Sequence, residues 1–245
     1  MMTYRFEVAV DSLESALTAQ DCGADRAELC ADLGIGGITP SLGALELAVE
    51  RLRIPVHVMI RPRRGDFLYT DAEFETMTRD IELAKSAGAH GVVFGMLLAD
   101  GDIDRARTDE LARAARPLSV TFHRAFDMCR DPLAALTDLM DLGVDTLLTS
   151  GQAPSAAQGA RLLEELVVRA AGRIEIMPGA GINAGNIARI AAETGARTFH
   201  FSARETLDGP MVYRNARASM GADDAAYARS YASAERIRQI IGALS

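Results

Sequence analysis

Carboxylate, guanidinium, thiol and imidazole groups recur at alternate positions within several short apolar segments of this chain. His57 and Arg61 alternate with valine and isoleucine, and Glu28 and Cys30 alternate with alanine and leucine. Because successive side chains of a β-strand point to opposite faces, each segment predicts a strand with one apolar and one polar face. The polar faces together carry Glu7, Glu28, Cys30, His57, Arg61, Thr121, His123, Glu175, His200 and Ser202.

Acid–base chemistry is the first function that these residue types indicate. A carboxylate beside arginine stays ionised, whereas one among apolar or acidic neighbours has a raised pKa, so Glu7 and Glu28 can take opposite roles. Arg61 suits an anionic group, and His123 can carry a proton near neutral pH. Asp127 follows on the next loop. We therefore predict Glu7, Glu28, Arg61, His123 and Asp127 as catalytic residues.

A structural interpretation of the same residues stays open. In that case Arg61 neutralises Glu7 and Glu28, and the histidines are satisfied by hydrogen bonds. Each residue alone is more often structural than catalytic, and only their convergence favours a site. His57 and Glu175 come early in their strands, and we interpret them as structural.

A Gly-Ala-Gly loop that begins at Gly179 is the second chemical signal. It follows a predicted strand, and we expect a helix to begin near Asn183. Small residues let backbone N–H groups approach an anion, and a helix N-terminus favours negative charge. We predict an anion site formed by Gly179, Gly181, Ser202 and Arg204. A tight turn that simply needs glycine is an equally good explanation.

The three cysteines, Cys22, Cys30 and Cys129, form no CxxC pair and no even disulfide framework. This usage is typical of a reduced, cytoplasmic protein. Cys30 is the cysteine on a polar strand face, so it is the candidate metal ligand. A set of thiol, thioether and imidazole suits Cu(I), with Met59 or a histidine as partner. A buried structural thiol is the alternative.

The elements that must position these residues follow a strand–helix repeat. Helices are indicated by a capping box at Thr70 and Glu73, by Asp131-Pro132, and by glycines after apolar helical patterns. The repeat predicts one (β/α)₈ TIM barrel, with an open doubly wound sheet as its rival. The predicted strands are Phe6–Val10, Ala27–Ala31, Val56–Arg61, Val92–Leu97, Leu118–Arg124, Thr146–Ser150, Ile174–Gly179 and Thr198–Ala203.

Composition limits the class of protein. The 245 residues are 49% hydrophobic and 24% charged, which excludes a disordered chain. The net charge of −8 disfavours non-specific binding to nucleic acid or an anionic membrane. The longest apolar stretch is too short for a membrane span, and the start lacks the apolar segment of a secretory signal. We expect one domain over residues 1–245, with a C-terminal loop (208–224) and helix after about residue 208.

Several strings at strand ends carry a family resemblance. They are Glu28-Leu29-Cys30, Gly36-Gly37-Ile38-Thr39-Pro40-Ser41, Ile60-Arg61-Pro62-Arg63, Thr121-Phe122-His123-Arg124, Leu148-Thr149-Ser150-Gly151, Met177-Pro178-Gly179-Ala180-Gly181 and His200-Phe201-Ser202-Ala203-Arg204. As a set, over about residues 4–220, the sequence resembles the CutC family of cytoplasmic copper-homeostasis proteins. The resemblance implies a TIM barrel, a role in copper tolerance through Cu(I) binding with Cys30 as the matched cysteine, and a homo-oligomer, with a dimer favoured.

Three functional hypotheses follow. The first is a cytoplasmic copper-homeostasis protein that binds Cu(I). The second is a barrel enzyme that acts on a small phosphorylated or carboxylated substrate at the C-terminal mouth of the barrel. The third is a structural or regulatory barrel without chemistry.

Overall fold

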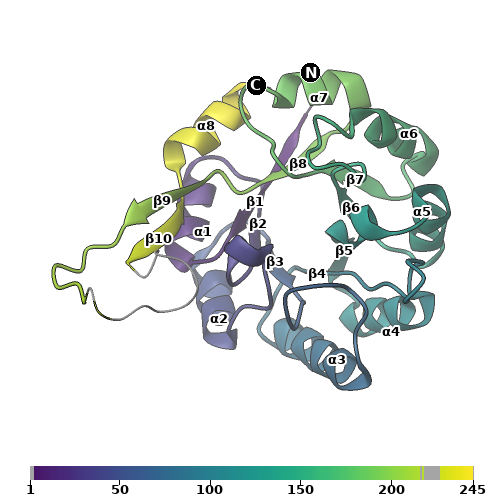
Figure 1. The fold of residues 1–245 in the computed structure, drawn as a ribbon, viewed down its shortest axis with the longest axis horizontal. Helices are drawn as coiled ribbons and strands as arrows, with labels where there is room; N and C mark the ends of the chain where they lie inside the picture. The colour runs from purple at the N-terminus through teal and green to yellow at the C-terminus, as the bar shows by residue number, and fades with distance from the viewer. Residues whose placement is uncertain (1–2, 216, 218–226, 245) are drawn as a thin grey trace.

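Eight strands form a ring that helices surround, and an antiparallel strand pair extends away from it (Figure 1). The computed structural model describes residues 3–215, 217 and 227–244. The barrel strands are β1 (Arg5–Val10), β2 (Arg26–Leu29), β3 (Val56–Met59), β4 (Gly91–Phe94), β5 (Ser119–Phe122), β6 (Thr146–Thr149), β7 (Glu175–Pro178) and β8 (Thr198–Phe201). The helices are α1 (Leu13–Asp21), η1 (Leu33–Ile35), α2 (Leu42–Arg51), α3 (Asp71–Ser86), α4 (Arg105–Ala115), η2 (Arg124–Met128), α5 (Pro132–Asp141), α6 (Ala160–Ala170), α7 (Ile187–Thr194) and α8 (Ala234–Gly242).

The sheet is parallel throughout, and its order confirms the TIM barrel. Neighbouring strands run β7-β6-β5-β4-β3-β2-β1-β8, so consecutive strands pair from β1 to β7, and β8 returns to pair with β1. The two ends of this order, β7 and β8, lie next to each other and complete the ring. A doubly wound sheet would reverse its order near the middle and keep two open edges, so that rival is excluded.

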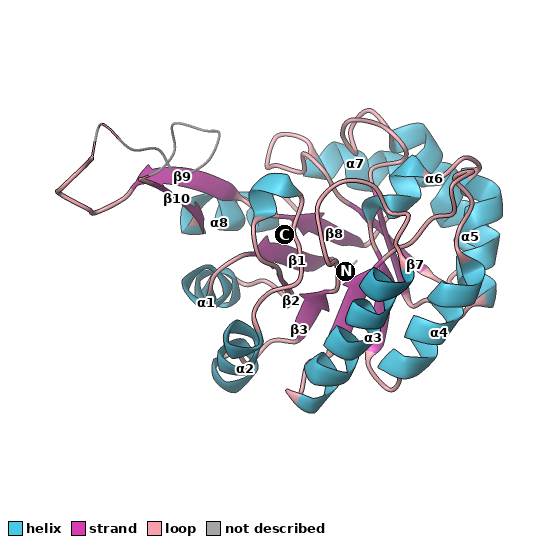
Figure 2. Cartoon of the chain, turned by 60° about the horizontal axis from the view of Figure 1, so that its bottom comes forward, coloured by secondary structure: helices cyan, strands magenta, loops and turns pink. Residues whose placement is uncertain are grey.

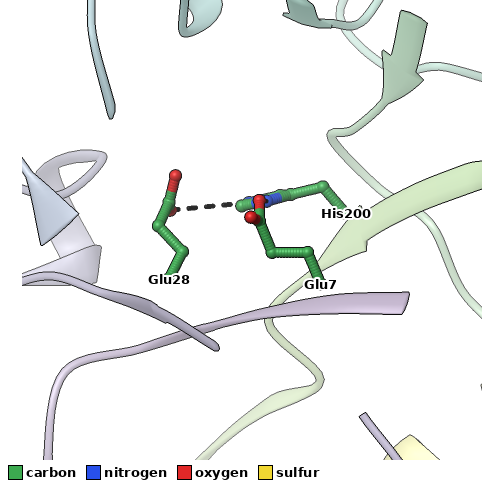
Figure 3. Close-up of side chains that lie close together, drawn as sticks. All are labelled: Glu7, Glu28 and His200. Carbon is green, nitrogen blue, oxygen red and sulfur yellow. Dashed lines mark hydrogen bonds and ion pairs between the residues drawn. The ribbon is translucent and has the colours of Figure 1, made fainter. Parts of the chain in front are cut away.

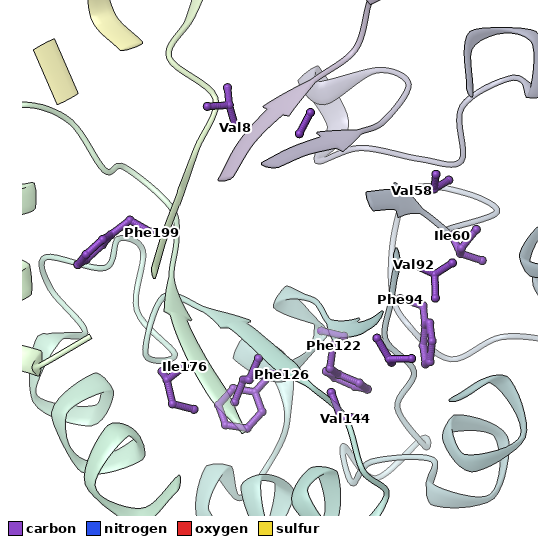
Figure 4. Packing of buried hydrophobic residues seen from close by; sticks show 14 of the residues in the cluster. Val8, Val58, Ile60, Val92, Phe94, Phe122, Phe126, Val144, Ile176 and Phe199 are labelled. Carbon is purple, nitrogen blue, oxygen red and sulfur yellow. The ribbon is translucent and has the colours of Figure 1, made fainter. Parts of the chain in front are cut away.

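The main core lies between the strands and the helices, as the apolar strand faces predict. Val8, Val58, Val92 and Phe199 are buried there, and they point outward from the ring (Figure 4). A smaller cluster of Cys30, Met59 and Val93, with Leu33 packed against it, is separate from this core. The remaining polar face of the strands is therefore what the barrel interior must accommodate.

The predicted helix signals at α3 and α5 are confirmed. Thr70 and Glu73 form both hydrogen bonds of the capping box. The side chain of Asp131 accepts hydrogen bonds from the backbone N–H groups of the two residues that follow Pro132. Each side chain satisfies backbone donors that a helix start leaves free.

The expected start of α7 near Asn183 is wrong, because that helix begins at Ile187. The side-chain amides of Asn183 and Asn186 both donate to the carbonyl of Gly181, at 3.0 and 2.8 Å. Short amide side chains that bond to nearby backbone compete with helix formation, and here they extend the loop by one turn.

Residues 209–215 and 217 form neither helix nor strand, as expected for the loop over residues 208–224, but the sequence interpretation missed the strand pair that flanks them. β9 (Arg204–Asp208) pairs in antiparallel fashion with β10 (Ala228–Ala232), and the pair projects from the barrel (Figure 2). Residues 216 and 218–224 of that range lie outside the described part of the chain. The chain then returns to the barrel, where the N–H of Ala232 donates to Ser15 Oγ at 3.1 Å. α8 follows beside α1 as the eighth helix of the ring.

No helix among the described residues combines the length and apolar character needed to cross a bilayer.

Gly159→Ala tests the close approach of the backbone at Gly159 to the backbone at Ser150 and Gly151, just after β6. A Cβ atom at residue 159 would overlap the carbonyl oxygen of Ser150 and lie 2.9 Å from the Cα of Gly151. Because backbone cannot move aside cheaply, we expect the free energy of unfolding to fall by about 3 kcal/mol. The measurement is urea unfolding followed by circular dichroism. Gly43→Ala is the control, since a Cβ there meets nothing within 4 Å. Equal stability of the two variants would contradict this close approach of the backbone.

Candidate functional site

A cavity of about 660 Å³ opens at the C-terminal ends of the strands. This is the end of the barrel where TIM-barrel enzymes bind their substrates. Its polar lining residues are Glu28, Arg61, His123, Arg124, Asn183, His200, Ser202, Arg204, Arg236 and Gln239. Four of these residues are arginines and one is a carboxylate, so the cavity is cationic in a protein that is acidic overall.

Glu7 lies beneath the floor of the cavity and is fully buried. Strand register places Glu7 directly opposite Arg26 of β2 and His200 of β8. Arg26 Nε donates to Glu7 Oε2, and His200 Nδ1 lies 2.7 Å from Glu7 Oε1. The other nitrogen of His200, Nε2, lies 3.8 Å from Glu28 Oε2 (Figure 3). The side chains of Glu7, Glu28 and His200 thus converge from three adjacent strands.

The pKa values of the two carboxyl groups shift in opposite directions, in line with the different environments that the sequence suggests for them. Burial alone would raise the pKa of Glu7, but Arg26 and His200 overcome that effect and hold the pKa well below its usual range. Burial raises the pKa of Glu28, and the negative charge of Glu7 raises it further. The pKa of His200 is raised because Glu28 and Glu7 outweigh its burial.

Arg61 is buried, with 6% exposure, and it does not pair with either acid. Its guanidinium donates to the carbonyls of Ile35, Gly37 and Gly65 at 3.0–3.2 Å and lies over the ring of Phe67. Its Nε has no hydrogen-bond partner, and among the described residues no carboxylate forms an ion pair with it. The alternative in which Arg61 neutralises Glu7 and Glu28 is therefore wrong.

Arg26 takes the neutralising role, and the sequence interpretation missed it. The predicted second strand began at Ala27, one residue too late. Arg26 shares a strand face with Glu28, so extending the predicted strand by one residue would have found it. His200 was placed in the lumen but was not among the predicted catalytic residues. Only the register of β8 against β1 shows its contact with Glu7.

His123 is a neutral hydrogen-bond donor at the cavity. Burial, reinforced by the positive charge of Arg61, lowers the pKa of His123 to about 3. Its Nδ1 accepts the N–H of Ala125 at 3.2 Å, which assigns the proton of the neutral ring to Nε2. That Nε2 is buried and has no protein partner. At neutral pH His123 therefore offers an N–H group to a ligand instead of exchanging a proton as its ordinary pKa would predict.

Asp127 does not line the cavity. Its carboxylate accepts bonds from Thr149 Oγ1, from Ser150 and from the backbone of Gln152, and it pairs with Arg124. These bonds tie η2 to the end of β6. The geometry thus gives Asp127 a positioning role in place of the catalytic role that we predicted for it.

The predicted anion site is only partly assembled at the cavity. Gly181, Ser202 and Arg204 line it, but Gly179 does not. The N–H of Gly179 already donates to Thr149 O at 3.0 Å, and a Cβ at residue 179 would lie 2.5 Å from the Leu148 side chain. Gly179 is therefore needed for close packing, and the N–H that an anion would use is occupied.

Cys30 lies inside the barrel wall but outside the cavity lining, with 2% exposure. Its thiol donates to Glu28 Oε2 at 3.4 Å. Burial and the adjacent Glu28 raise the pKa of Cys30 well above its usual value, which disfavours the thiolate that metals bind. In the described chain, Glu7, Glu28 and His200 form the group of three metal-ligating side chains, with ligand atoms within 4.8 Å of one another. Carboxylate oxygens and one imidazole do not fit Cu(I), which prefers sulfur.

The pH dependence of the free energy of unfolding tests whether His57 is buried in its neutral form. Burial lowers the pKa of His57 to about 4, below the value of about 6.5 in an unfolded chain. The unfolded state therefore binds more protons in acid, so this stabilisation is complete above pH 6.5 and is lost as the pH falls. Between about pH 6 and about pH 4.5, the free energy of unfolding of the wild type should therefore fall faster with decreasing pH than that of His57→Asn. The difference should be about 1.4 kcal/mol per pH unit.

Guanidinium unfolding of both proteins at each pH measures this difference. The titrations of Glu28 and His200 occur in both proteins and cancel when the two curves are subtracted. Parallel curves would show that His57 is charged in the folded protein.

Comparison with known proteins identifies the family. The CutC family model matches residues 4–205. A family protein CutC of Bacteroides thetaiotaomicron is 50% identical over 249 residues, covering 100% of this chain and 99% of the relative. The copper homeostasis protein cutC homolog of Homo sapiens is 52% identical over 219 residues, covering 89% of this chain and 80% of the relative.

Solved structures agree with this result. A CutC structure from Streptococcus agalactiae has a TM-score of 0.78 and 32% identity, and covers 82% of this chain and 99% of its own. An aldolase with a TM-score of 0.61 and 16% identity, covering 80% of this chain and 89% of its own, shares the barrel fold alone. The sequence, the fold and the relatives agree, and the chain belongs to the CutC family.

Proposed function

We propose that this protein is a barrel enzyme that binds a small anionic organic substrate in the mouth cavity. The observation that carries the proposal is Arg61, a buried positive charge that lines the cavity without a carboxylate partner. A buried charge without a counter-charge is costly, and proteins keep such groups where a ligand completes them. A carboxylate or phosphate group is the complement that a guanidinium binds best.

The donors around Arg61 support an anion at this position. His123 is neutral and offers only its Nε2–H, so it can donate to an anion without adding a charge of its own. Ser202 and Arg204 line the same cavity from the β8 side. In the described residues, no carboxylate pairs with the Arg204 guanidinium. We therefore assign a second anionic group of the substrate, a phosphate, to Gly181, Ser202 and Arg204.

The floor supplies the chemistry of the proposed enzyme. Because its pKa is raised, Glu28 is the carboxyl group suited to give a proton to the substrate or take one from it. His200 lies next to Glu28 and shares the cavity. Glu7 has no contact with the cavity, and it orients His200 through Nδ1. The reaction class is proton transfer at a carbon or oxygen atom of a carboxylated or phosphorylated substrate.

Arg61→Met tests the anion-binding role. Inorganic phosphate and phosphoglycolate serve as probes in isothermal titration calorimetry with the full chain. Losing a charge-assisted contact should weaken binding of phosphoglycolate about 10- to 100-fold. Arg173→Gln is the matched control, because that arginine precedes β7 at the opposite end of the barrel and pairs with Asp141 on the surface. Undiminished affinity in the Arg61 variant, or no binding by the wild type, would contradict the proposed function.

A second candidate function is copper binding, which the names of the relatives suggest for those proteins. The observation that favours it here is the small buried cluster in which Cys30 packs with Met59. A thiolate and a thioether are the ligand types that Cu(I) prefers. In this candidate function the ion is cargo and is held at the wall of the cavity, which Met59 lines and Cys30 does not.

Competition for Cu(I) with a chromophoric chelator tests this candidate. Cys30→Ser should lower Cu(I) affinity at least about tenfold, because oxygen is a poor ligand for this ion. Cys129→Ser, which alters a thiol on a different loop, should bind as the wild type does. Equal affinity in all three proteins would remove Cys30 as the site.

We also propose a cytoplasmic homo-oligomer. All three cysteines are free and buried, which agrees with a reducing compartment. Leu207, Met211, Val212 and Tyr213 are exposed on or just after β9, in the part of the chain that projects from the barrel. Large apolar side chains exposed close together in the chain are typical of a contact between protein copies.

A further inference from the structure

We propose that the cavity floor binds a divalent cation, Zn²⁺ or Mn²⁺, through His200 and Glu28. Glu7 would hold the imidazole from behind. The proposal shares two residues with the proposed enzyme but does not depend on it, because cation binding is measured without a substrate.

The spacing of the ligand atoms supports the cation site. His200 Nε2 and Glu28 Oε2 lie 3.8 Å apart, which is too long for a hydrogen bond. A cation with ligand bonds of about 2.0–2.2 Å to each atom would separate them by about 3.4–3.8 Å, at bond angles near those of tetrahedral or trigonal geometry. The two side chains therefore stand at the distance that a shared metal ion would require, without a change of rotamer.

An unsatisfied oxygen is the second, independent observation. Glu28 has 2% exposure, and its Oε1 is buried without a hydrogen-bond donor. A buried carboxylate oxygen without a partner is destabilising. A cation bound by both oxygens of Glu28 and by the deprotonated Nε2 of His200 would satisfy this oxygen.

The contacts behind the imidazole match those of known metal centres. Metal-ligating histidines usually donate their other ring N–H to a carboxylate, which fixes the tautomer and the ring orientation. Glu7 Oε1 takes this position at 2.7 Å from Nδ1, and Arg26 holds the second oxygen of Glu7. His200 is thus oriented with Nε2 toward Glu28 before any ion arrives.

The donor set decides which ion is expected. An imidazole nitrogen with carboxylate oxygens suits Zn²⁺ or Mn²⁺ better than Cu(I). Cys30 contacts Glu28 but does not belong to the group of converging ligands. With two direct protein ligands, the remaining coordination positions would face the cavity, where water or an anionic substrate can occupy them.

Calorimetric titration of the chelator-treated protein with MnCl₂ and with ZnCl₂ tests the site. Glu28→Gln and His200→Asn should each weaken binding at least about tenfold, because each removes one of two direct ligands. Glu175→Gln is the control, since that carboxylate lies at the start of β7 and pairs with Arg5 and Thr198. Arg61→Met should bind the cation unchanged while losing phosphoglycolate, which separates this proposal from the proposed function.

A measurement on the wild type covers the case in which a variant fails to fold. The visible spectrum of the Co²⁺-loaded protein should lack the intense charge-transfer band of a thiolate ligand. Such a band would place the ion on a cysteine and overturn the proposal. It would equally be overturned if neither Mn²⁺ nor Zn²⁺ bound the wild type, or if folded Glu28→Gln and His200→Asn bound as the wild type does.

Discussion

The ionised carboxylate of Glu7, fully buried in the barrel wall, is the constraint on which the rest of the site depends. Such a charge is tolerated only when it is paired and hydrogen-bonded. The register of β1 with β2 and β8 supplies both partners, Arg26 and His200. A slip of one residue in either ladder would turn these partners to the other face of the sheet and leave the charge without a partner. The ion pairs therefore depend on the strand register of the barrel and, in turn, favour it.

This satisfied centre contrasts with the incomplete polar groups above it. Glu28 Oε1, Arg61 Nε and His123 Nε2 are buried and without partners, although each belongs to a residue that lines the cavity. A purely structural plug would have paired these groups with one another, as Glu7 is paired below. An acid, a cation and a neutral donor that line one cavity without pairing with one another are the arrangement expected of a ligand-binding site.

The family name and the site geometry point to different chemistry. The names of the human and mouse relatives refer to copper homeostasis, and the sulfur ligands that copper prefers are present as Cys30 and Met59. Met59 lines the cavity and Cys30 lies behind the lining against Glu28, whereas the converging ligand atoms are oxygen and nitrogen donors. The structure thus places a candidate pair of soft-metal ligands at the wall of a polar mouth suited to anions and hard cations. A fold shared with aldolases at 16% identity does not choose between them, because barrels host many chemistries.

The sequence by itself determined the eightfold strand–helix repeat, the helix caps at Thr70 and Asp131, and the strand face on which the polar residues lie. These are local properties, set by a period of two along a strand and by backbone groups within one helical turn. Only the tertiary structure decided that Arg26 pairs with Glu7, that Arg61 stays without a carboxylate, and that the N–H of Gly179 is already bonded. The physical reason is that alternation fixes which face a side chain takes, whereas its partner depends on the stagger between strands that are distant in the sequence.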